Sequence, residues 1–184
     1  MQTRAIFFDR DGVLNDSLDR GGNFFVRGKK VQWTAPFAYE EFRIKPKVIE
    51  VLKTAQAAGF LTILATNQPD VAYGLLPQKE YDRIMAEVAT WPLDDIFVCH
   101  HTRDENCACK KPKPGMLLDA AKKWNIDLAQ SYMVGDTESD MKAARAAGVA
   151  SVLLRAPYNK DIVGEYEIES LPDLIFLLKN GTIA

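Results

Sequence analysis

The sequence predicts an α/β protein of Rossmann-like, three-layer architecture, in which a parallel sheet is covered by helices on both faces. Short apolar runs alternate along the chain with longer segments whose apolar residues recur at helical spacing. Strands connected through helices run parallel with right-handed crossovers, and such crossovers place helices on both sides of the sheet. With 184 residues, 47% of them hydrophobic, the chain can bury one sizeable core, so we expect a single domain over residues 1–184.

Six short apolar runs are the predicted strands. The first, residues 5–8, reads Ala-Ile-Phe-Phe and ends directly before an acidic turn. The others cover residues 61–65, 95–98, 132–134 and 151–154, with a possible sixth at 166–168. Ligands of open α/β sheets bind at the carboxyl ends of the strands, so chemistry is expected in the residues that follow these runs.

Five segments have the marks of amphipathic helices. Pro46 opens the first, whose apolar residues follow helical spacing, and Gly59 ends it. Pro77 opens the second. Thr137 and Asp140 resemble a capping pair at the start of the fourth. The last three helices are expected at residues 115–124, 137–148 and 170–180.

Residues 16–43 form the irregular part of the chain and resemble a flap inserted after the first strand. Long structured loops of this kind are often functional. The alternative is a packed surface flap whose aromatic residues only anchor it. The segment is rich in aromatic and basic side chains, namely Phe24, Phe25, Trp33, Phe37, Tyr39, Phe42, Arg20, Arg27, Lys29 and Lys30.

Composition argues against several classes of partner. The net charge is −2, from 23 basic and 25 acidic residues, so no global electrostatic attraction to nucleic acid or an anionic membrane is expected. No cleavable signal pattern and no run approaching the roughly 18 apolar residues of a membrane span is present. We therefore expect a soluble, cytoplasmic protein that binds a small molecule.

Asp9 and Asp11 are the most informative residues of the chain. They follow the first strand in the sequence FDRDGVLN, where side chains alternate and both carboxylates are expected to point the same way, with Gly12 turning the chain behind them. A carboxylate beside a hard cation can attack phosphorus while its neighbour carries a proton. The alternative is a pair of ordinary turn residues.

Three further loops follow predicted strands or lead toward them. Thr66 and Asn67 offer a hydroxyl and backbone N–H groups that suit phosphoryl oxygens. Lys111 lies in a stiff, proline-rich segment that could fix an ammonium over the same site, and Asp136 could give a cation another carboxylate. Each motif also has an ordinary structural explanation. Thr66 and Asn67 could form a turn, Lys111 could lie at a solvated helix start, and Asp136 could be a helix cap. Their common place at strand ends favours a shared site.

The order of these motifs, D-x-D-G-x-L-N, T-N-Q, K-P-x-P-G-M and G-D-x-x-x-D, resembles the haloacid dehalogenase superfamily of phosphohydrolases over about residues 4 to 156. The resemblance implies that Asp9 is the nucleophile that forms an aspartyl-phosphate and that Asp11 is the general acid and base. It also implies Mg²⁺ bound by Asp9, the backbone carbonyl of Asp11, and Asp136. Asp140 would support the site from behind the ligands.

The same resemblance assigns the phosphoryl group to Thr66 and Asn67 and makes Lys111 the residue that neutralises its charge. Cap domains of the superfamily enter after the first motif or between the second and third. Here those intervals hold only the flap-like segment and one helix, too little for a large cap domain. The site is therefore expected to be open, with the flap and a neighbouring cysteine-rich loop supplying substrate contacts. A monomer is expected from the resemblance alone.

The cysteine-rich loop, residues 99–109, predicts a structural zinc site. All three cysteines and both histidines of the chain lie in this window, and Cys99, His101, Cys107 and Cys109 form a set suited to tetrahedral Zn²⁺. His100 could replace His101, although the C-x-H spacing mirrors the C-x-C arm. Reduced surface cysteines or a labile disulfide are the alternatives. Four protein ligands leave no open position for chemistry, and the loop leads directly to Lys110 and Lys111.

This zinc loop is similar to that of the subgroup containing D-glycero-D-manno-heptose 1,7-bisphosphate phosphatases and histidinol-phosphate phosphatases. Three departures concern the substrate: Tyr73 stands where the heptose enzymes typically have Arg, Lys110 replaces another Arg, and the 16–43 segment is longer than usual. The resemblance implies a heptose bisphosphate as substrate, with histidinol phosphate or another sugar or nucleotide phosphate as alternatives. A non-catalytic, zinc-stabilised binding domain is the alternative from another functional class.

Overall fold

The computed structural model describes residues 2–183 and has the predicted Rossmann-like architecture. Six parallel strands form one sheet in the order β5-β4-β1-β6-β7-β8. The strands are β1 (Arg4–Phe8), β4 (Phe60–Asn67), β5 (Asp95–Cys99), β6 (Tyr132–Gly135), β7 (Ala150–Leu154) and β8 (Tyr166–Ile168). All six predicted strands are therefore present, including the shortest, β8.

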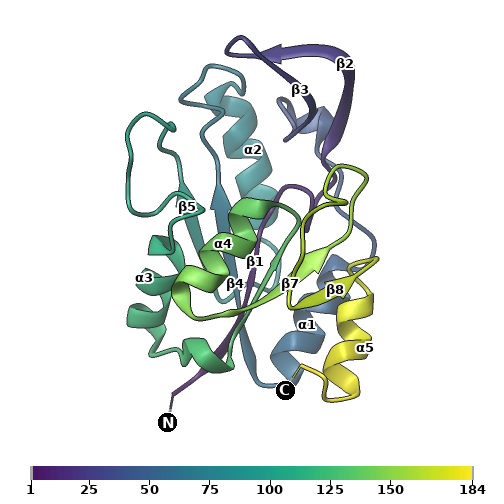
Figure 1. Ribbon diagram of the computed structural model, residues 1–184, viewed down its shortest axis with the longest axis vertical. Helices are drawn as coiled ribbons and strands as arrows, with labels where there is room; N and C mark the ends of the chain where they lie inside the picture. The colour runs from purple at the N-terminus through teal and green to yellow at the C-terminus, as the bar shows by residue number, and fades with distance from the viewer. Residues whose placement is uncertain (1, 184) are drawn as a thin grey trace.

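Helices cover both faces of the sheet (Figure 1). They are α1 (Val48–Ala57), α2 (Gln78–Val88), α3 (Gly115–Trp124), α4 (Glu138–Ala147) and α5 (Asp173–Lys179). Ile6 and Phe8 of β1 face the core formed with α1, α2 and α5, whereas Ala5 and Phe7 face α3 and α4. This alternation explains why residues 5–8 of β1 are apolar without interruption, because each face of the strand is buried under helices there.

The helix boundaries follow the predicted ones, but the first and last helices begin two and three residues later than predicted, at Val48 and at Asp173. The first helix begins at Val48 instead of Pro46, because Lys47 takes a left-handed conformation with φ of 64° and forms the N-cap. The capping pair of the fourth helix is confirmed, since the backbone N–H of Thr137 donates to Asp140 Oδ2 at 3.0 Å. That bond fixes the start of α4 directly behind the end of β6.

The segment predicted to be irregular contains a β-hairpin, which is a correction. β2 (Leu18–Val26) and β3 (Lys29–Thr34) pair antiparallel, followed by the 3₁₀ turn η1 (Tyr39–Glu41). Arg27 and Gly28 connect the strands with φ of 50° and 74°, the positive values that two-residue hairpin turns of type I′ require. Most residues of both strands are at least partly exposed, so the hairpin lacks the apolar pattern from which strands are predicted.

The hairpin lies at the end of the sheet where the parallel strands finish, at the top of Figure 1. Within residues 2–183, the chain from β1 to α1 holds only this hairpin and η1, and the chain from β4 to β5 holds only α2. The expectation that no large cap domain is present is therefore confirmed. None of the described helices has the length and apolar character needed to cross a membrane.

Candidate active site

The carboxyl ends of three neighbouring strands converge on one site. Asp9 follows β1, Asn67 ends β4, and Asp136 follows β6, and these strands are adjacent in the order β4-β1-β6. The backbone N–H of Asp9 donates to the carbonyl of Val134 at 3.0 Å, which extends the β1–β6 pairing as far as the first acid. The positions of Asp9 and Asp136 are thus set by the sheet itself.

A cavity of about 350 Å³ opens at this edge. Five of the predicted site residues line it, and the hairpin and the loop after β7 contribute further lining residues. Its lining consists of Asp9, Asp11, Ser17, Trp33, Thr34, Ala35, Asn67, Lys111, Asp136, Thr137, Ser139, Asp140 and Tyr158. The open mouth predicted for the site is therefore partly walled by aromatic residues.

Lys111 is buried between two acids. Its Nζ lies 3.0 Å from Asp9 Oδ1 and 2.5 Å from Asp140 Oδ1, and its side chain is 1% exposed. Burial alone would lower the pKa of Lys111, but Asp140 and Asp9 together raise it above the usual lysine value. The lysine therefore carries a permanent positive charge beside the Asp9 carboxylate.

Asn67 holds the backbone of Lys111. Its Nδ2 donates to the carbonyl of Lys111 at 3.0 Å, and its Oδ1 accepts from the N–H of Lys111 at 3.0 Å. This paired contact joins the end of β4 to the proline-rich segment after the zinc loop. Asn67 thus fixes the segment that carries Lys111 as well as lining the cavity.

Three carboxylates have the chemistry of a hard-cation site. Asp9, Asp136 and Asp140 each place an oxygen within 4.8 Å of the others, and all three residues are buried. Asp136 Oδ1 is buried without a hydrogen-bond partner among residues 2–183. Because Lys111 supplies only one positive charge, the cluster keeps an excess of negative charge that a divalent cation would offset.

The raised pKa values of Asp9 and Asp136 agree with this excess of negative charge. Burial raises the pKa of Asp9 to about 6, with Lys111 acting against it and the neighbouring carboxylates of Asp140 and Asp11 adding to it. Burial, followed by repulsion from Asp140 and Asp9, raises the pKa of Asp136 well above its usual range. The donor set and its charge fit Mg²⁺ bound by oxygen ligands.

Asp11 lines the cavity, but its carboxylate is engaged by side chains that the sequence did not single out. Arg10 Nη2 lies 3.0 Å from both oxygens of Asp11, and Asn15 and Gln68 donate to the same carboxylate at 3.0 and 2.6 Å. Arg10 is completely buried, with its guanidinium 5.9 Å from the ring centre of Phe42. These donors hold the second acid of the motif in a defined position.

Thr66 and Lys110 lie outside this cavity. Thr66 is fully buried at the end of β4, where its hydroxyl accepts from Gln68 Nε2 at 2.9 Å. Lys110 lines an adjoining cavity of about 260 Å³ that shares Asn67, Lys111 and Ser139 with the first. The adjoining cavity also contains Arg103 and Lys113, so it is rich in positive charge.

The cysteine-rich loop brings four potential zinc ligands together. The sulfur atoms of Cys99, Cys107 and Cys109 lie 3.2 to 3.6 Å apart, and none forms a disulfide within residues 2–183. His101 Nδ1 lies 3.6 Å from Cys99 Sγ and 3.2 Å from Cys109 Sγ. Burial and the neighbouring thiols raise the pKa of Cys109 to about 12. A soft cation would stabilise thiolates that otherwise repel one another, and this donor set fits Zn²⁺.

The other histidine of the loop contacts a different element. His100 Nε2 is 3.4 Å from the hydroxyl of Tyr81 on α2, and the two rings meet edge to face at 5.2 Å. His101 is therefore the histidine whose ring nitrogen faces the three sulfur atoms.

The family model of the haloacid dehalogenase-like hydrolases matches residues 19–148. The chain belongs to this family. A D-glycero-beta-D-manno-heptose-1,7-bisphosphate 7-phosphatase from Helicobacter pylori is 37% identical over 158 residues, covering 82% of this chain and 83% of the relative. A protein of the same name from Pasteurella multocida is 35% identical over 194 residues, covering 96% and 97%.

Solved structures of the family agree with the fold. The D,D-heptose 1.7-bisphosphate phosphatase from B. bronchiseptica, complexed with magnesium and phosphate, superposes with a TM-score of 0.77 at 29% identity, covering 97% of this chain and 99% of that one. A putative HAD-like phosphatase from Mesorhizobium loti superposes with a TM-score of 0.70 at 25% identity, covering 97% and 87%. This hydrolase therefore shares its overall fold with phosphatases along almost its entire length.

Proposed function

We propose that this hydrolase is a Mg²⁺-dependent phosphatase of D-glycero-D-manno-heptose 1,7-bisphosphate that removes the C7 phosphate through an aspartyl-phosphate. The observation that carries the proposal is the placement of Asp9 between the Lys111 ammonium and the Asp136 carboxylate at one edge of the sheet. The names of the relatives support the substrate.

In the proposed reaction, a carboxylate oxygen of Asp9 attacks phosphorus and the ester P–O bond breaks. Asp11 donates its proton to the departing sugar oxygen, so the alcohol leaves neutral. A water molecule then attacks the phosphorus of the aspartyl-phosphate and gives its proton to Asp11. The P–O bond to Asp9 breaks, which restores both acids and releases inorganic phosphate.

The remaining residues of the site are proposed to bind Mg²⁺ and the phosphoryl group and to hold Lys111 beside the nucleophile. Asp9, the backbone carbonyl of Asp11, and Asp136 would hold Mg²⁺, which when bound offsets the charge of the phosphoryl oxygens. Lys111 supplies a second, permanent positive charge beside the nucleophile. Asn67 holds the segment of Lys111 and, because it lines the cavity, is proposed to contact the phosphoryl group, whereas the buried Thr66 is proposed to support the end of β4 from behind it. Asp140 supports Lys111 from its other side.

Zinc is proposed to be structural and separate from the magnesium site. Cys99, His101, Cys107 and Cys109 would close its coordination, leaving no position for substrate. Stabilisation of residues 99–109 would in turn position Lys110 and Lys111, which follow directly along the chain.

The second phosphate of the substrate is proposed to bind in the adjoining cavity, where Lys110, Arg103 and Lys113 provide positive charge. The hairpin, with Trp33 in the cavity wall, is proposed to act as a flap that contacts the sugar. We further propose that residues 1–184 form one domain and that the protein is a cytoplasmic monomer. Light scattering of the purified protein tests the monomeric state.

Comparison of kcat/KM for heptose 1,7-bisphosphate, fructose 1,6-bisphosphate and histidinol phosphate tests the substrate, because specificity is a ratio of these values. The heptose bisphosphate should be preferred. A preference for histidinol phosphate above about tenfold, equivalent to about 1.4 kcal/mol of transition-state stabilisation, would instead favour the histidinol-phosphate class. Absence of turnover with every phosphate ester in the presence of Mg²⁺ would support a non-catalytic zinc-stabilised domain.

A further inference from the structure

The loop after β7, residues 155–162, touches the candidate magnesium site at two points. Asn159 is buried, and its Nδ2 donates to the backbone carbonyl of Asp136 at 2.8 Å and to that of Leu154 at 2.9 Å. The hydroxyl of Tyr158 donates to Asp136 Oδ2. The loop therefore contacts both the main chain and the carboxylate of Asp136.

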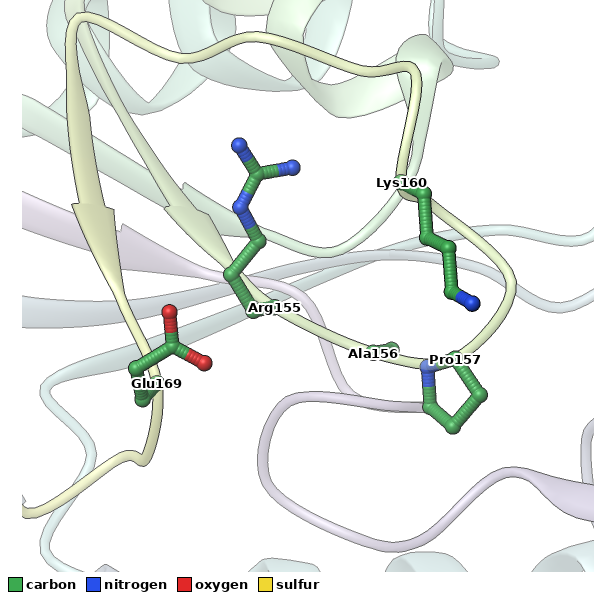
Figure 2. A pocket seen from close by; sticks show the side chains of 5 residues that line it. All are labelled: Arg155, Ala156, Pro157, Lys160 and Glu169. Carbon is green, nitrogen blue, oxygen red and sulfur yellow. The ribbon is translucent and has the colours of Figure 1, made fainter.

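The loop is held by hydrogen bonds of its own residues. Figure 2 shows Arg155, Ala156, Pro157 and Lys160 of this loop where they line a pocket with Glu169. Arg155 donates to the carbonyls of Asn159 and Ile162 at 3.3 and 2.9 Å and pairs with Glu167 of β8 at 2.5 Å. The N–H of Ala156 donates to Asn159 Oδ1 at 2.9 Å. These bonds fix the backbone on either side of Tyr158, so its hydroxyl reaches Asp136 from a rigid support.

Two further residues restrict the Tyr158 side chain. The ring of Trp33 on β3 lies 5.1 Å from the Tyr158 ring at 48°, and Ser17 Oγ lies 3.3 Å from the Tyr158 hydroxyl. A phenol has one hydrogen, which the Asp136 carboxylate attracts most strongly, so Ser17 is left to donate to Tyr158. A chain of hydrogen bonds thus runs from Ser17 through Tyr158 to Asp136.

Gly12 leaves the space in which this contact forms. It has a φ of 86°, and a Cβ at this position would collide with the Asp136 carboxyl group and with the Tyr158 hydroxyl. The carboxylate is therefore confined between the Gly12 backbone and Tyr158, with only Oδ1 lacking a hydrogen-bond partner among residues 2–183.

We propose that Tyr158 is a positioning residue of the magnesium site, which holds Asp136 by Oδ2 and leaves Oδ1 directed to the cation. This inference rests on the proposed function, because it takes Asp136 as a magnesium ligand. Hydrogen bonds to a ligating carboxylate commonly change metal affinity by about 10–100-fold, so the hydroxyl of Tyr158 should have an effect of that size.

The test measures Mg²⁺ affinity by isothermal titration calorimetry of the zinc-loaded protein without substrate. Tyr158→Phe keeps the ring against Trp33 and removes only the hydroxyl, and it should weaken Mg²⁺ binding about 10–100-fold. Tyr166→Phe is the matched control, since Tyr166 lies on β8 and its ring packs at 6.0 Å from that of Tyr132. This control should bind Mg²⁺ like the unmodified protein.

Turnover gives a second measurement. In Tyr158→Phe the Mg²⁺ concentration for half-maximal rate should rise about 10–100-fold, in step with the loss of Mg²⁺ affinity. If Tyr158→Phe does not fold, Tyr158→Leu removes the same hydroxyl, and unchanged Mg²⁺ affinity in that variant would overturn the proposal.

The variant Asp136→Asn distinguishes a failure of the role proposed for Tyr158 from a failure of the proposed magnesium site. If Asp136→Asn loses Mg²⁺ while Tyr158→Phe binds it normally, the magnesium site stands and the role of Tyr158 is wrong. If Asp136→Asn binds Mg²⁺ normally, the metal site is wrong, and the role of Tyr158 is wrong with it.

Discussion

The side chain of Asn67 forms two hydrogen bonds with the backbone of Lys111, one to its carbonyl and one from its N–H, each 3.0 Å long. The contact joins the end of β4 to a loop 44 residues further along the chain. It places the lysine ammonium between Asp9 and Asp140 without using the ammonium itself. The position of the charge in the site therefore depends on an uncharged residue.

Asn67→Ala should lower kcat/KM about 10–100-fold, because each lost hydrogen bond contributes about 0.5–1.5 kcal/mol to holding Lys111. Steady-state kinetics with a phosphate ester measures the change. Asn67→Asp is the informative comparison, since it keeps the acceptor for the N–H of Lys111 and loses the donor to its carbonyl. If Asn67→Ala retains full kcat/KM, the lysine is held by its ion pairs alone.

Asp9→Asn should abolish turnover and prevent trapping of the enzyme by fluoroberyllate with Mg²⁺. The nucleophile forms the covalent bond, so its loss should cost far more than loss of a positioning group. Asp16→Asn is the control, because Asp16 pairs with Lys45 at 2.8 Å at the surface. Turnover of Asp9→Asn close to the original rate would exclude the aspartyl-phosphate.

Arg10→Met should lower the free energy of unfolding by about 3–5 kcal/mol, the usual loss when one partner of a buried ion pair is removed. The change leaves the Asp11 carboxylate without its strongest partner in a site where Arg10 is fully buried. Arg83→Met provides the contrast, since Arg83 and its partner Glu40 are exposed, and surface pairs of this kind add little to stability. Urea unfolding of both variants measures the difference, and equal losses would contradict this account.

The sheet and its helices could be predicted because their burial leaves a pattern in the sequence. The central parallel strands β1, β6 and β7 are buried on both faces and mostly apolar, and the helices carry apolar stripes. The β2–β3 hairpin packs little of its surface, so turn conformation and backbone pairing hold it, and these leave only a weak signal such as Arg27-Gly28.

Some of the site residues could likewise be predicted from the sequence, and others could not. Asp9, Asn67, Lys111 and Asp136 could be proposed because each follows or ends a recognisable strand or motif. Arg10, Gln68 and Tyr158 could not, because their roles depend on contacts formed only after folding. Tyr158, for example, lies 22 residues beyond the Asp136 carboxylate to which it donates.

Asp70 should make the free energy of unfolding depend on pH. Burial, with repulsion from Asp11, raises the pKa of Asp70 from 3.8 to about 6. The folded protein therefore binds more protons than the unfolded chain between these values, and stability falls as pH rises through the interval. Asp70→Asn should remove this loss, so at pH 8 the variant should be more stable than the original protein by about 3 kcal/mol.

The gain from Asp70→Asn should shrink toward zero as pH falls below the unfolded value, because Asp70 is then protonated in both states. Denaturant unfolding at pH 8 and at pH 4 measures both limits. A gain of equal size at the two pH values would mean that the amide acts through packing and not through charge.

The adjacent histidines of the zinc loop offer a matched pair of variants. His101→Ala should lose most of the bound zinc, because His101 Nδ1 faces the sulfurs of Cys99 and Cys109. His100→Ala should keep it, since His100 instead contacts Tyr81 on α2. Metal analysis after purification under reducing, chelator-free conditions should find one zinc per chain in the original protein and in His100→Ala.

Activity should follow zinc content without depending on zinc chemistry. His101→Ala should lower kcat/KM because the loop that leads to Lys110 and Lys111 loses its support, and added Mg²⁺ should not restore it. Asp136→Ala should retain zinc while losing Mg²⁺-dependent turnover, since carboxylate oxygens prefer the harder cation and the thiolates the softer one. Loss of zinc from Asp136→Ala, or from His100→Ala and not His101→Ala, would show that the two metal sites have been assigned to the wrong residues.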